Sequence, residues 1–149
     1  DGSHSITINA SDNDGNAATA VSSTYTIDTV PPTLTVSSPS AGLITNKAAL
    51  TIKGVTNDAT SSPITLTVTL NGTSLGTVSV GSDGSFSKDV TLVEGTNSIV
   101  VTAKDGAGQT SSITLSVKLD TTVPQLNSIV LTPNPANTSA SVAITVEVS

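Results

Sequence analysis

The most regular pattern in the chain is a strict alternation of apolar and hydroxyl side chains. In residues 64–70 (ITLTVTL) every second residue is apolar, and the same alternation recurs within 97–104 and 111–119. A period of two is typical of an antiparallel strand that buries one face, whereas an amphipathic helix has a period of 3.6 residues. We therefore expect strands and no helix.

Turn signals separate the alternating runs. Asn71-Gly72 lies between two of them and predicts a hairpin, because glycine readily takes the positive φ that such a turn needs. Short strands with a turn every 8 to 12 residues, about seven in about 90 residues, predict an all-β fold, a two-sheet β-sandwich of immunoglobulin-like (Ig-like) type. The predicted strands are 33–37, 48–54, 64–70, 74–80, 85–92, 97–104 and 111–119, with 4–11 and 20–27 before them and 126–132 and 140–148 after them.

The chain also repeats itself at an offset of about 92 residues. Residues 4–16 align with 97–109, and residues 26–29 align with 118–121. Self-similarity at a fixed offset indicates a repeat architecture. We therefore predict one complete repeat flanked by two partial ones: 1–29 as the C-terminal strands of a preceding repeat, 30–121 as a complete domain, and 122–149 as the N-terminal strands of a following repeat.

Composition excludes several function classes. The 149 residues contain no cysteine, so the chain has no disulfide, no thiolate metal site and no cysteine nucleophile. Five basic residues against eleven acidic ones give a net charge of −6, which leaves no basic patch for nucleic acid. No apolar run approaches the roughly 18 residues of a membrane span, so membrane insertion is not expected either.

Three motifs carry a family resemblance. They are residues 94–109 (EGTNSIVVTAKDGAGQ), the linker 28–32 (DTVPP) and residues 34–39 (LTVSSP). Together they resemble the tandem bacterial Ig-like domains of large secreted and cell-surface proteins. The resemblance implies an extracellular or cell-surface module that serves as a stalk in an adhesin, as a surface-layer segment, or as a spacer beside a glycoside hydrolase. Such motifs mark a fold rather than an activity.

No group of residues predicts an enzyme. His4 is the only histidine, and its counterpart in the second copy is Asn97. The chain contains no phosphate loop, no GxSxG elbow and no HExxH motif. We interpret His4 as an exposed residue at the start of a strand and expect no catalytic centre.

One loop has the composition of a calcium-binding segment. Asp12, Asp14 and Asn16 place oxygen ligands at alternate positions, which suits a hard cation. The loop is not an EF-hand, because Ala17 stands where the invariant glycine belongs and no bidentate glutamate follows. A hairpin turn, in which Asp, Asn and Gly serve backbone geometry, explains the same residues.

The expected topology suggests a second arrangement of acids. In an Ig-like sandwich the loop between the sixth and seventh strands lies at the same end as the loop between the second and third, beside the point where the chain enters. Asp105, Asp58 with Asn57, and the linker residue Asp28 could therefore converge at a domain junction and bind calcium. Lys104 beside Asp105 would weaken such a site, and solvated surface acids are the alternative. The candidate metal ligands are Asp12, Asp14, Asn16, Asp28, Asp58, Asp105 and Asp120.

These observations favour a non-enzymatic spacer or stalk module of an extracellular repeat protein. Pro31 and Pro32 restrict the linker, because each fixes φ and limits the preceding residue. One alternative is a self-assembling filament or lattice subunit whose chain ends complement each other's strands. Another is a sugar- or host-protein-binding module, although we interpret the only aromatic residues, Tyr25 and Phe86, as core residues. Expected partners are neighbouring Ig-like repeats or identical chains, with a glycan or host surface reached through other parts of the parent protein.

Overall fold

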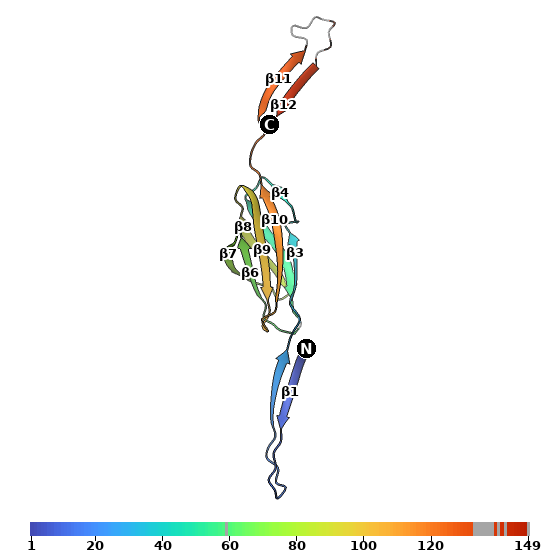
Figure 1. Ribbon diagram of the computed structural model, residues 1–149, viewed down its shortest axis with the longest axis vertical. Helices are drawn as coiled ribbons and strands as arrows, with labels where there is room; N and C mark the ends of the chain where they lie inside the picture. Colours follow the sequence, from blue (N-terminus) through green and yellow to red (C-terminus); the bar gives the residue numbers. More distant parts are fainter. Residues whose placement is uncertain (59, 133–138, 140, 142, 149) are drawn as a thin grey trace.

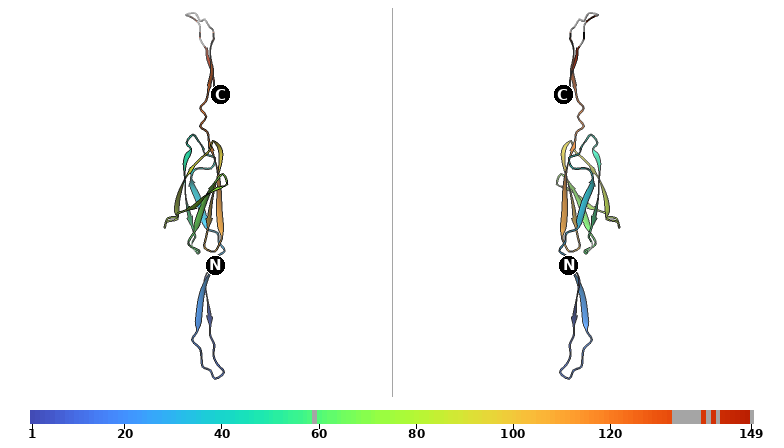
Figure 2. Two further views of the ribbon diagram at one scale, coloured as in Figure 1. Left: turned by 90° about the vertical axis from the view of Figure 1, so that its left-hand side faces the viewer. Right: turned by 90° about the vertical axis from the view of Figure 1, so that its right-hand side faces the viewer.

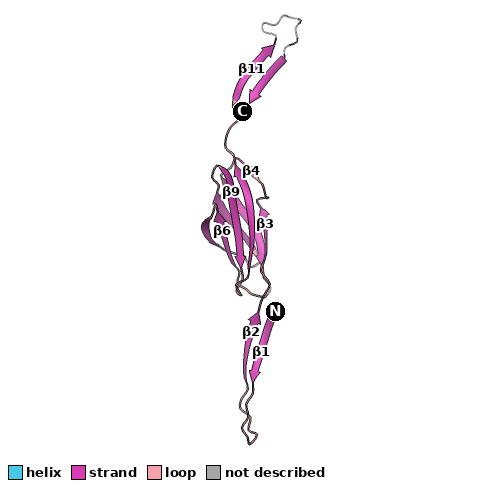
Figure 3. Cartoon of the chain, viewed as in Figure 1, coloured by secondary structure: helices cyan, strands magenta, loops and turns pink. Residues whose placement is uncertain are grey.

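The computed structural model describes residues 1–58, 60–132, 139, 141 and 143–148, and within these ranges the regular structure is β-strand, as the alternation predicts (Figure 1, Figure 3). A central sandwich carries one hairpin beyond each of its two ends (Figure 2). The fold is the all-β, Ig-like sandwich that the sequence predicts. Within the described ranges, no helix has the length and apolar character needed to cross a membrane. The strands are β1 Gly2–Ile8, β2 Val21–Ile27, β3 Thr33–Ser38, β4 Ile44–Thr45, β5 Ala49–Asn57, β6 Thr65–Leu70, β7 Thr73–Val78, β8 Ser85–Thr91, β9 Gly95–Lys104, β10 Thr110–Leu119, β11 Leu126–Thr132 and β12 Ala143–Val148.

Two sheets make up the sandwich. One has the strand order β4-β10-β9-β6-β7 and the other the order β3-β5-β8. Neighbouring strands pair antiparallel, except that the short β4 pairs parallel with the end of β10. The hairpins β1–β2 and β11–β12 each form a separate two-stranded sheet.

The alternating residues of both sheets form one core. Along β9 every second side chain, from Asn97 to Ala103, is buried, and β10 follows the same pattern up to Leu119. Burying an aliphatic side chain of this size contributes roughly 1.5–3 kcal/mol, so the alternation stabilises the sandwich and sets which face of each strand turns inward. The buried apolar residues are Ile52, Leu66, Val68, Val78, Phe86, Val90, Leu92, Ile99, Val101, Ala103, Leu115, Val117 and Leu119.

The predicted hairpin at Asn71-Gly72 is confirmed. Strands β6 and β7 pair antiparallel across it, and both turn residues have positive φ, 52° for Asn71 and 81° for Gly72. Two consecutive positive φ values give a turn whose twist matches that of the flanking strands. Asn71 also accepts a hydrogen bond from the Ser98 N–H at Oδ1, which ties the turn to β9.

Two expectations from the sequence need correction. Strand β4 was not predicted, because two residues that pair with the end of β10 are too few to show an alternating pattern. Tyr25 is not a core residue: it is 46% exposed and stacks on His4 with ring centroids 5.4 Å apart. Within the described residues no second sheet covers β2, whereas Phe86 lies between the sheets of the sandwich and is buried as expected.

The first hairpin pairs in the same register as strands β9 and β10. Gly2 pairs with Ile27, and Gly95 pairs with Leu119. Gly2 and Gly95 are 93 positions apart and Ile27 and Leu119 are 92 apart, which are the offsets of the sequence repeat. The hairpin β1–β2 therefore has the pairing of the last two strands of the sandwich.

The second hairpin corresponds in the same way to β3 and β5. Val130 pairs with Thr145, and Ser38 pairs with Lys53, again 92 positions apart. Each of the two pairs also contains one register shift, near Ser128 in β11 and near Ser38 in β3. The pairing of both hairpins thus agrees with the repeat in the sequence. The division into one complete and two partial repeats, with its limits, stays a prediction.

Candidate functional site

Three acidic side chains meet where the linker reaches the sandwich. Asp28 follows β2, Asp58 follows β5 and Asp105 follows β9. One carboxylate oxygen from each lies within 4.8 Å of the others. The structure thus brings together three of the seven candidate ligands, at the junction where the Ig-like topology placed them.

Ser61 holds the two sandwich loops in this arrangement. Its backbone carbonyl accepts the Gly106 N–H at 3.2 Å, and its Oγ accepts the Ala107 N–H at 2.9 Å. Its own N–H donates to Oδ1 of Asp58 at 2.8 Å. Ser61 therefore couples the loop that carries Asp58 to the turn that carries Asp105. The sequence offered no signal for this role, because Ser61 lies in a serine-rich chain and its partners in the turn, Gly106 and Ala107, are far from it along the chain.

Each carboxylate uses one oxygen for local backbone geometry. The Oδ2 atoms of Asp28 and Asp105 are buried and accept no hydrogen bond. Asp28 is only 9% exposed and Asp105 only 5%. Because buried acceptors in folded proteins almost always find a donor, two such oxygens in one cluster point to a ligand. The backbone donors to Oδ1 are Val30 for Asp28 (3.1 Å), Thr60 and Ser61 for Asp58 (2.7 and 2.8 Å) and Gln109 for Asp105 (2.8 Å).

No cationic side chain balances the cluster. Among the described residues the only ion pair joins Lys118 to Asp120, and Lys104 is exposed without one. At a separation of 4.8 Å or less and an effective dielectric constant near 20, two carboxylates repel each other by at least about 3 kcal/mol. A small cation relieves this repulsion, so the donor set has the chemistry of a hard-metal site.

A polar pocket of about 270 Å³ lies beside the cluster. It is open to solvent and is bounded by the end of β2, the loop after β5 and the turn after β9. An ion and its water ligands can therefore reach the junction from outside. The lining residues are Thr26, Asp28, Thr60, Ser61, Ser62, Gly106 and Ala107.

The loop at Asp12 is a hairpin turn in this structure. Oδ1 of Asp12 accepts the N–H groups of Asp14 and Asn16, and Oδ2 accepts Nδ2 of Asn16 at 2.7 Å. These bonds, led by the one from the Asn16 side chain, hold the pKa of Asp12 below its ordinary value. Within the described ranges neither Asp12 nor Asp14 belongs to a group of acids able to share a metal. The carboxylate of Asp12 thus serves the turn.

Asp120 also lies outside the cluster. Its carboxylate accepts a hydrogen bond from Lys118 Nζ at 3.1 Å and one from the Thr122 N–H at 3.3 Å. The Lys118 bond is the main reason that the pKa of Asp120 is below its ordinary value. The backbone carbonyl of Asn57, the last residue of β5, accepts a hydrogen bond from the Thr33 hydroxyl.

The linker at residues 28–32 and the second linker, residues 120–125 between β10 and β11, are fastened by the same clamp, an acidic side chain that accepts hydrogen bonds from a threonine. The Asp1 carboxylate accepts bonds from the N–H and Oγ1 of Thr29, at 3.0 and 2.9 Å. The Glu94 carboxylate accepts the equivalent bonds from Thr121, the shortest at 2.8 Å. Asp1 aligns with Glu94 and Thr29 with Thr121 at the repeat offsets, so the alignment held a signal for this clamp that sequence reasoning missed.

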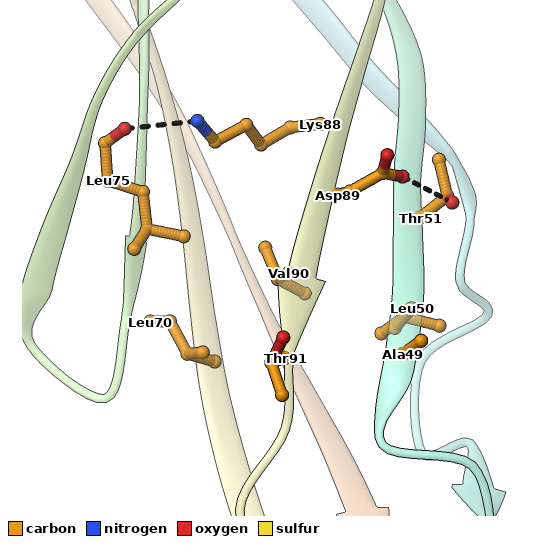
Figure 4. Close-up of a pocket in the computed structure, with 9 residues that line it drawn as sticks. All are labelled: Ala49, Leu50, Thr51, Leu70, Leu75, Lys88, Asp89, Val90 and Thr91. Atoms are coloured by element: carbon orange, nitrogen blue, oxygen red, sulfur yellow. Dashed lines mark hydrogen bonds between the residues drawn. The ribbon is translucent and has the colours of Figure 1, made fainter.

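A larger groove opens between the two sheets at the β7 and β8 edges. Its volume is about 620 Å³, and its lining holds no aromatic side chain (Figure 4). Its two charged residues are engaged: Lys88 Nζ donates to the Leu75 carbonyl at 3.1 Å, and Asp89 accepts the Thr51 hydroxyl at 2.6 Å. The groove therefore lacks the stacking face that sugar-binding sites use. It is lined by Ala49, Leu50, Thr51, Leu70, Leu75, Lys88, Asp89, Val90 and Thr91.

The sandwich matches a described protein family. A family model for domain B of glucodextranase covers residues 32–121, more than half of the chain and all of β3 to β10. The chain belongs to this family. The glucodextranase domain B match begins at Pro32, the last residue of the first linker, and ends at Thr121, so Asp58 and Asp105 lie inside it and Asp28 lies just before it.

Other proteins are similar to this chain in sequence or in fold. Bacillopeptidase F of Bacillus subtilis (strain 168) is 31% identical over 121 residues, which is 80% of this chain but only 8% of that protein. Fibronectin(III)-like modules of Clostridium thermocellum CbhA align at a TM-score of 0.52 and 17% identity, over 79% of this chain and 62% of theirs. A tetra-tandem repeat from the extending region of a large adhesion protein aligns at 0.50 and 21% identity, over 98% and 45%. The fold is that of Ig-like and fibronectin-III-like repeat modules.

Proposed function

We propose that the chain is a spacer module of an extracellular repeat protein, such as an adhesin, a surface-layer protein or a secreted enzyme. Its function is to extend the polypeptide and hold a neighbouring domain at a distance. The path of the chain through the sandwich and the contacts that hold its linkers support this function.

The chain enters and leaves the sandwich at opposite ends. The first linker leads into β3 at one end, and the end of β10 leads to β11 at the other (Figure 1, Figure 2). Modules connected in this way add their lengths in an array. This arrangement is the single observation that carries the proposal, and the same fold in the extending region of a large adhesion protein is in keeping with it.

The linkers are held by repeated contacts. Besides the Asp1–Thr29 and Glu94–Thr121 clamps, Pro32 is fully buried and its carbonyl accepts the Ser111 hydroxyl at 2.6 Å. Proline removes backbone freedom at the same point. A short linker that is hydrogen-bonded at both ends resists bending, which suits a spacer.

Small-angle X-ray scattering on the whole chain tests this function. We expect the distance distribution of an extended particle, and a Glu94→Ala, Thr121→Val double variant with a looser second linker and a shorter mean end-to-end distance. A matched variant, Ser87→Ala on an exposed sandwich strand, should leave the curve unchanged. A compact particle, or no response to loss of the clamp, would contradict the spacer function.

A second candidate function is assembly through the chain ends. The apolar faces of both hairpins are exposed, including Ile6, Ile8 and Val21 in the first and Ile129 and Ile144 in the second. Hairpins equivalent to β9–β10 and to β3–β5 belong to opposite sheets of one sandwich, so two chains could cover each other's apolar faces. Light scattering separates the candidates: concentration-dependent polymers favour assembly, and a monomer at all concentrations favours the spacer.

A further inference from the structure

We propose that the junction before the sandwich binds one calcium ion, and that Asp28, Asp58 and Asp105 supply its protein ligands. The ligand set rests on its own geometry and would hold for any role of the chain. Its mechanical consequence, a linker fixed against the sandwich, rests on the proposed spacer function.

The spacing of the carboxylates suits a single calcium ion. Calcium binds oxygen ligands at about 2.3–2.6 Å, so oxygens on opposite sides of one ion lie about 5 Å apart. The three carboxylates offer oxygens within 4.8 Å of one another. One ion can therefore contact all three without movement of the loops, while water fills its remaining positions through the adjoining pocket.

The second observation is the state of the carboxylate oxygens. Asp28 and Asp105 each give Oδ1 to a backbone N–H and keep a buried Oδ2 that accepts nothing. Clusters of exposed acids are ordinary surface features, but these two side chains are more than nine-tenths buried. Burying an ionised carboxylate without a partner is costly. A divalent cation supplies the missing partner to both oxygens at once.

The ligands are held in place by contacts that do not involve the ion. Ser61 joins the Asp58 loop to the Asp105 turn, and the bond from Ser111 to the Pro32 carbonyl sets the direction of the linker. A preorganised ligand set loses little conformational entropy when the ion binds. The geometry therefore favours binding.

The repeat places the same ligand types at other junctions. Asp12 aligns with Asp105, and both close the same turn, with N–H to carbonyl bonds of 3.0 Å to Asn16 and 3.1 Å to Gln109. Asp120 aligns with Asp28. Asp14 aligns with Ala107, which is not a ligand. The cluster therefore depends on the first acid of the turn, Asp105, and not on a second acid two residues later. An array of these repeats would carry one ion at each junction.

Calorimetry on the whole chain, stripped of metal with EDTA, tests the site. Titration with calcium chloride should give one ion per chain. Asp28→Asn and Asp105→Asn should each weaken binding at least tenfold, since each removes a charged ligand but keeps an Oδ1 for the backbone N–H. Asp12→Asn is the matched control, because it changes the equivalent turn outside the cluster, and binding should stay within twofold of the unchanged chain.

Three results would overturn the site. They are the absence of heat at millimolar calcium, equal binding by the Asp28 and Asp105 variants, and equal loss in the Asp12 control. Magnesium chloride is the comparison cation. We expect it to bind at least tenfold more weakly, because magnesium requires near-ideal octahedral geometry at 2.0–2.1 Å. Magnesium binding as tight as that of calcium would overturn the assignment to calcium.

Backbone ¹⁵N relaxation separates the site from its consequence. If the ion fixes the linker, amides of β1–β2 and of the sandwich should tumble with one correlation time in calcium and with two after EDTA. Asp105→Asn should keep two in both conditions. Calcium binding without this change would overturn the mechanical consequence and leave the site in place.

Discussion

Strands β1 and β9 have nearly the same sequence pattern and opposite environments. Ile6 aligns with Ile99 and Ile8 with Val101, and the two strands pair with their neighbours in the same register. Yet Ile6 is 54% exposed, whereas Ile99 is fully buried. An alternating strand therefore specifies its pairing and one apolar face, but only a second sheet buries that face.

The same contrast holds for the polar positions. Asn97 is buried and satisfied on both sides of its amide, since Oδ1 accepts the Val93 N–H at 3.0 Å and Nδ2 donates to the Val93 and Gly95 carbonyls. Its counterpart His4 is exposed on β1 and stacks on Tyr25. A position that holds a buried structural residue in the sandwich thus holds an exposed residue in the hairpin.

The largest effect is expected from shortening the paired isoleucines. Ile99→Ala should destabilise the sandwich by roughly 2–5 kcal/mol, because it leaves a cavity in a closed core. Ile6→Ala should change stability by less than about 0.5 kcal/mol, since the side chain is already largely in water. Urea unfolding measures both. A large loss for Ile6→Ala would show that a second chain covers the hairpin, and would favour assembly.

The next effect concerns the paired polar residues. Asn97→Ala should cost about 2 kcal/mol, because it removes the three hydrogen bonds that the buried Asn97 amide makes with the Val93 N–H and with the Val93 and Gly95 carbonyls. His4→Ala should be nearly neutral. The midpoints of thermal unfolding of the two variants, followed by circular dichroism, make the comparison. Equal shifts would mean that the hairpin has a packed interior like that of the sandwich.

Gly54 and Val146 form a third pair, related by the same offset in β5 and β12. A methyl group on Gly54 would press on the Thr35 carbonyl and lie 2.5 Å from Phe86 Cζ, so Gly54→Ala should cost roughly 1–3 kcal/mol. Val146 is 51% exposed, and Val146→Ala should have little effect. Chemical denaturation checks both. A neutral Gly54→Ala would show that β3 and β8 yield easily.

The smallest effect is expected in the Asp12 turn, which is local and does not need the second sheet. Hydrogen bonds, chiefly from the Asn16 side chain, lower the pKa of Asp12 below its ordinary 3.8. The pKa of Asp12 is lower in the folded chain than in the unfolded chain, so ionised Asp12 stabilises the turn above about pH 4. That stabilisation is lost as the pH falls through the folded pKa. NMR titration of the carboxyl should show the low pKa, and Asn16→Ala should raise it. An unchanged pKa in that variant would contradict the turn geometry.

Sequence reasoning located most of the fold but only part of the candidate site. Alternation and turn residues act over a few positions, so they located the strands, and the Ig-like topology predicted that Asp28, Asp58 and Asp105 share one end. The role of Ser61 and the unpartnered oxygens of Asp28 and Asp105 could not be predicted. They depend on contacts between loops that are far apart in the chain.

Strand pattern and turn chemistry are local properties, and the amino-acid order determines them directly, as it does the repeat. Burial is not local. It depends on whether another sheet lies over a given face, which is why Ile6 and Ile99 differ and why Tyr25 is exposed. The acid cluster has the same origin: three loops had to be packed against one another before their carboxylates came within the reach of one ion.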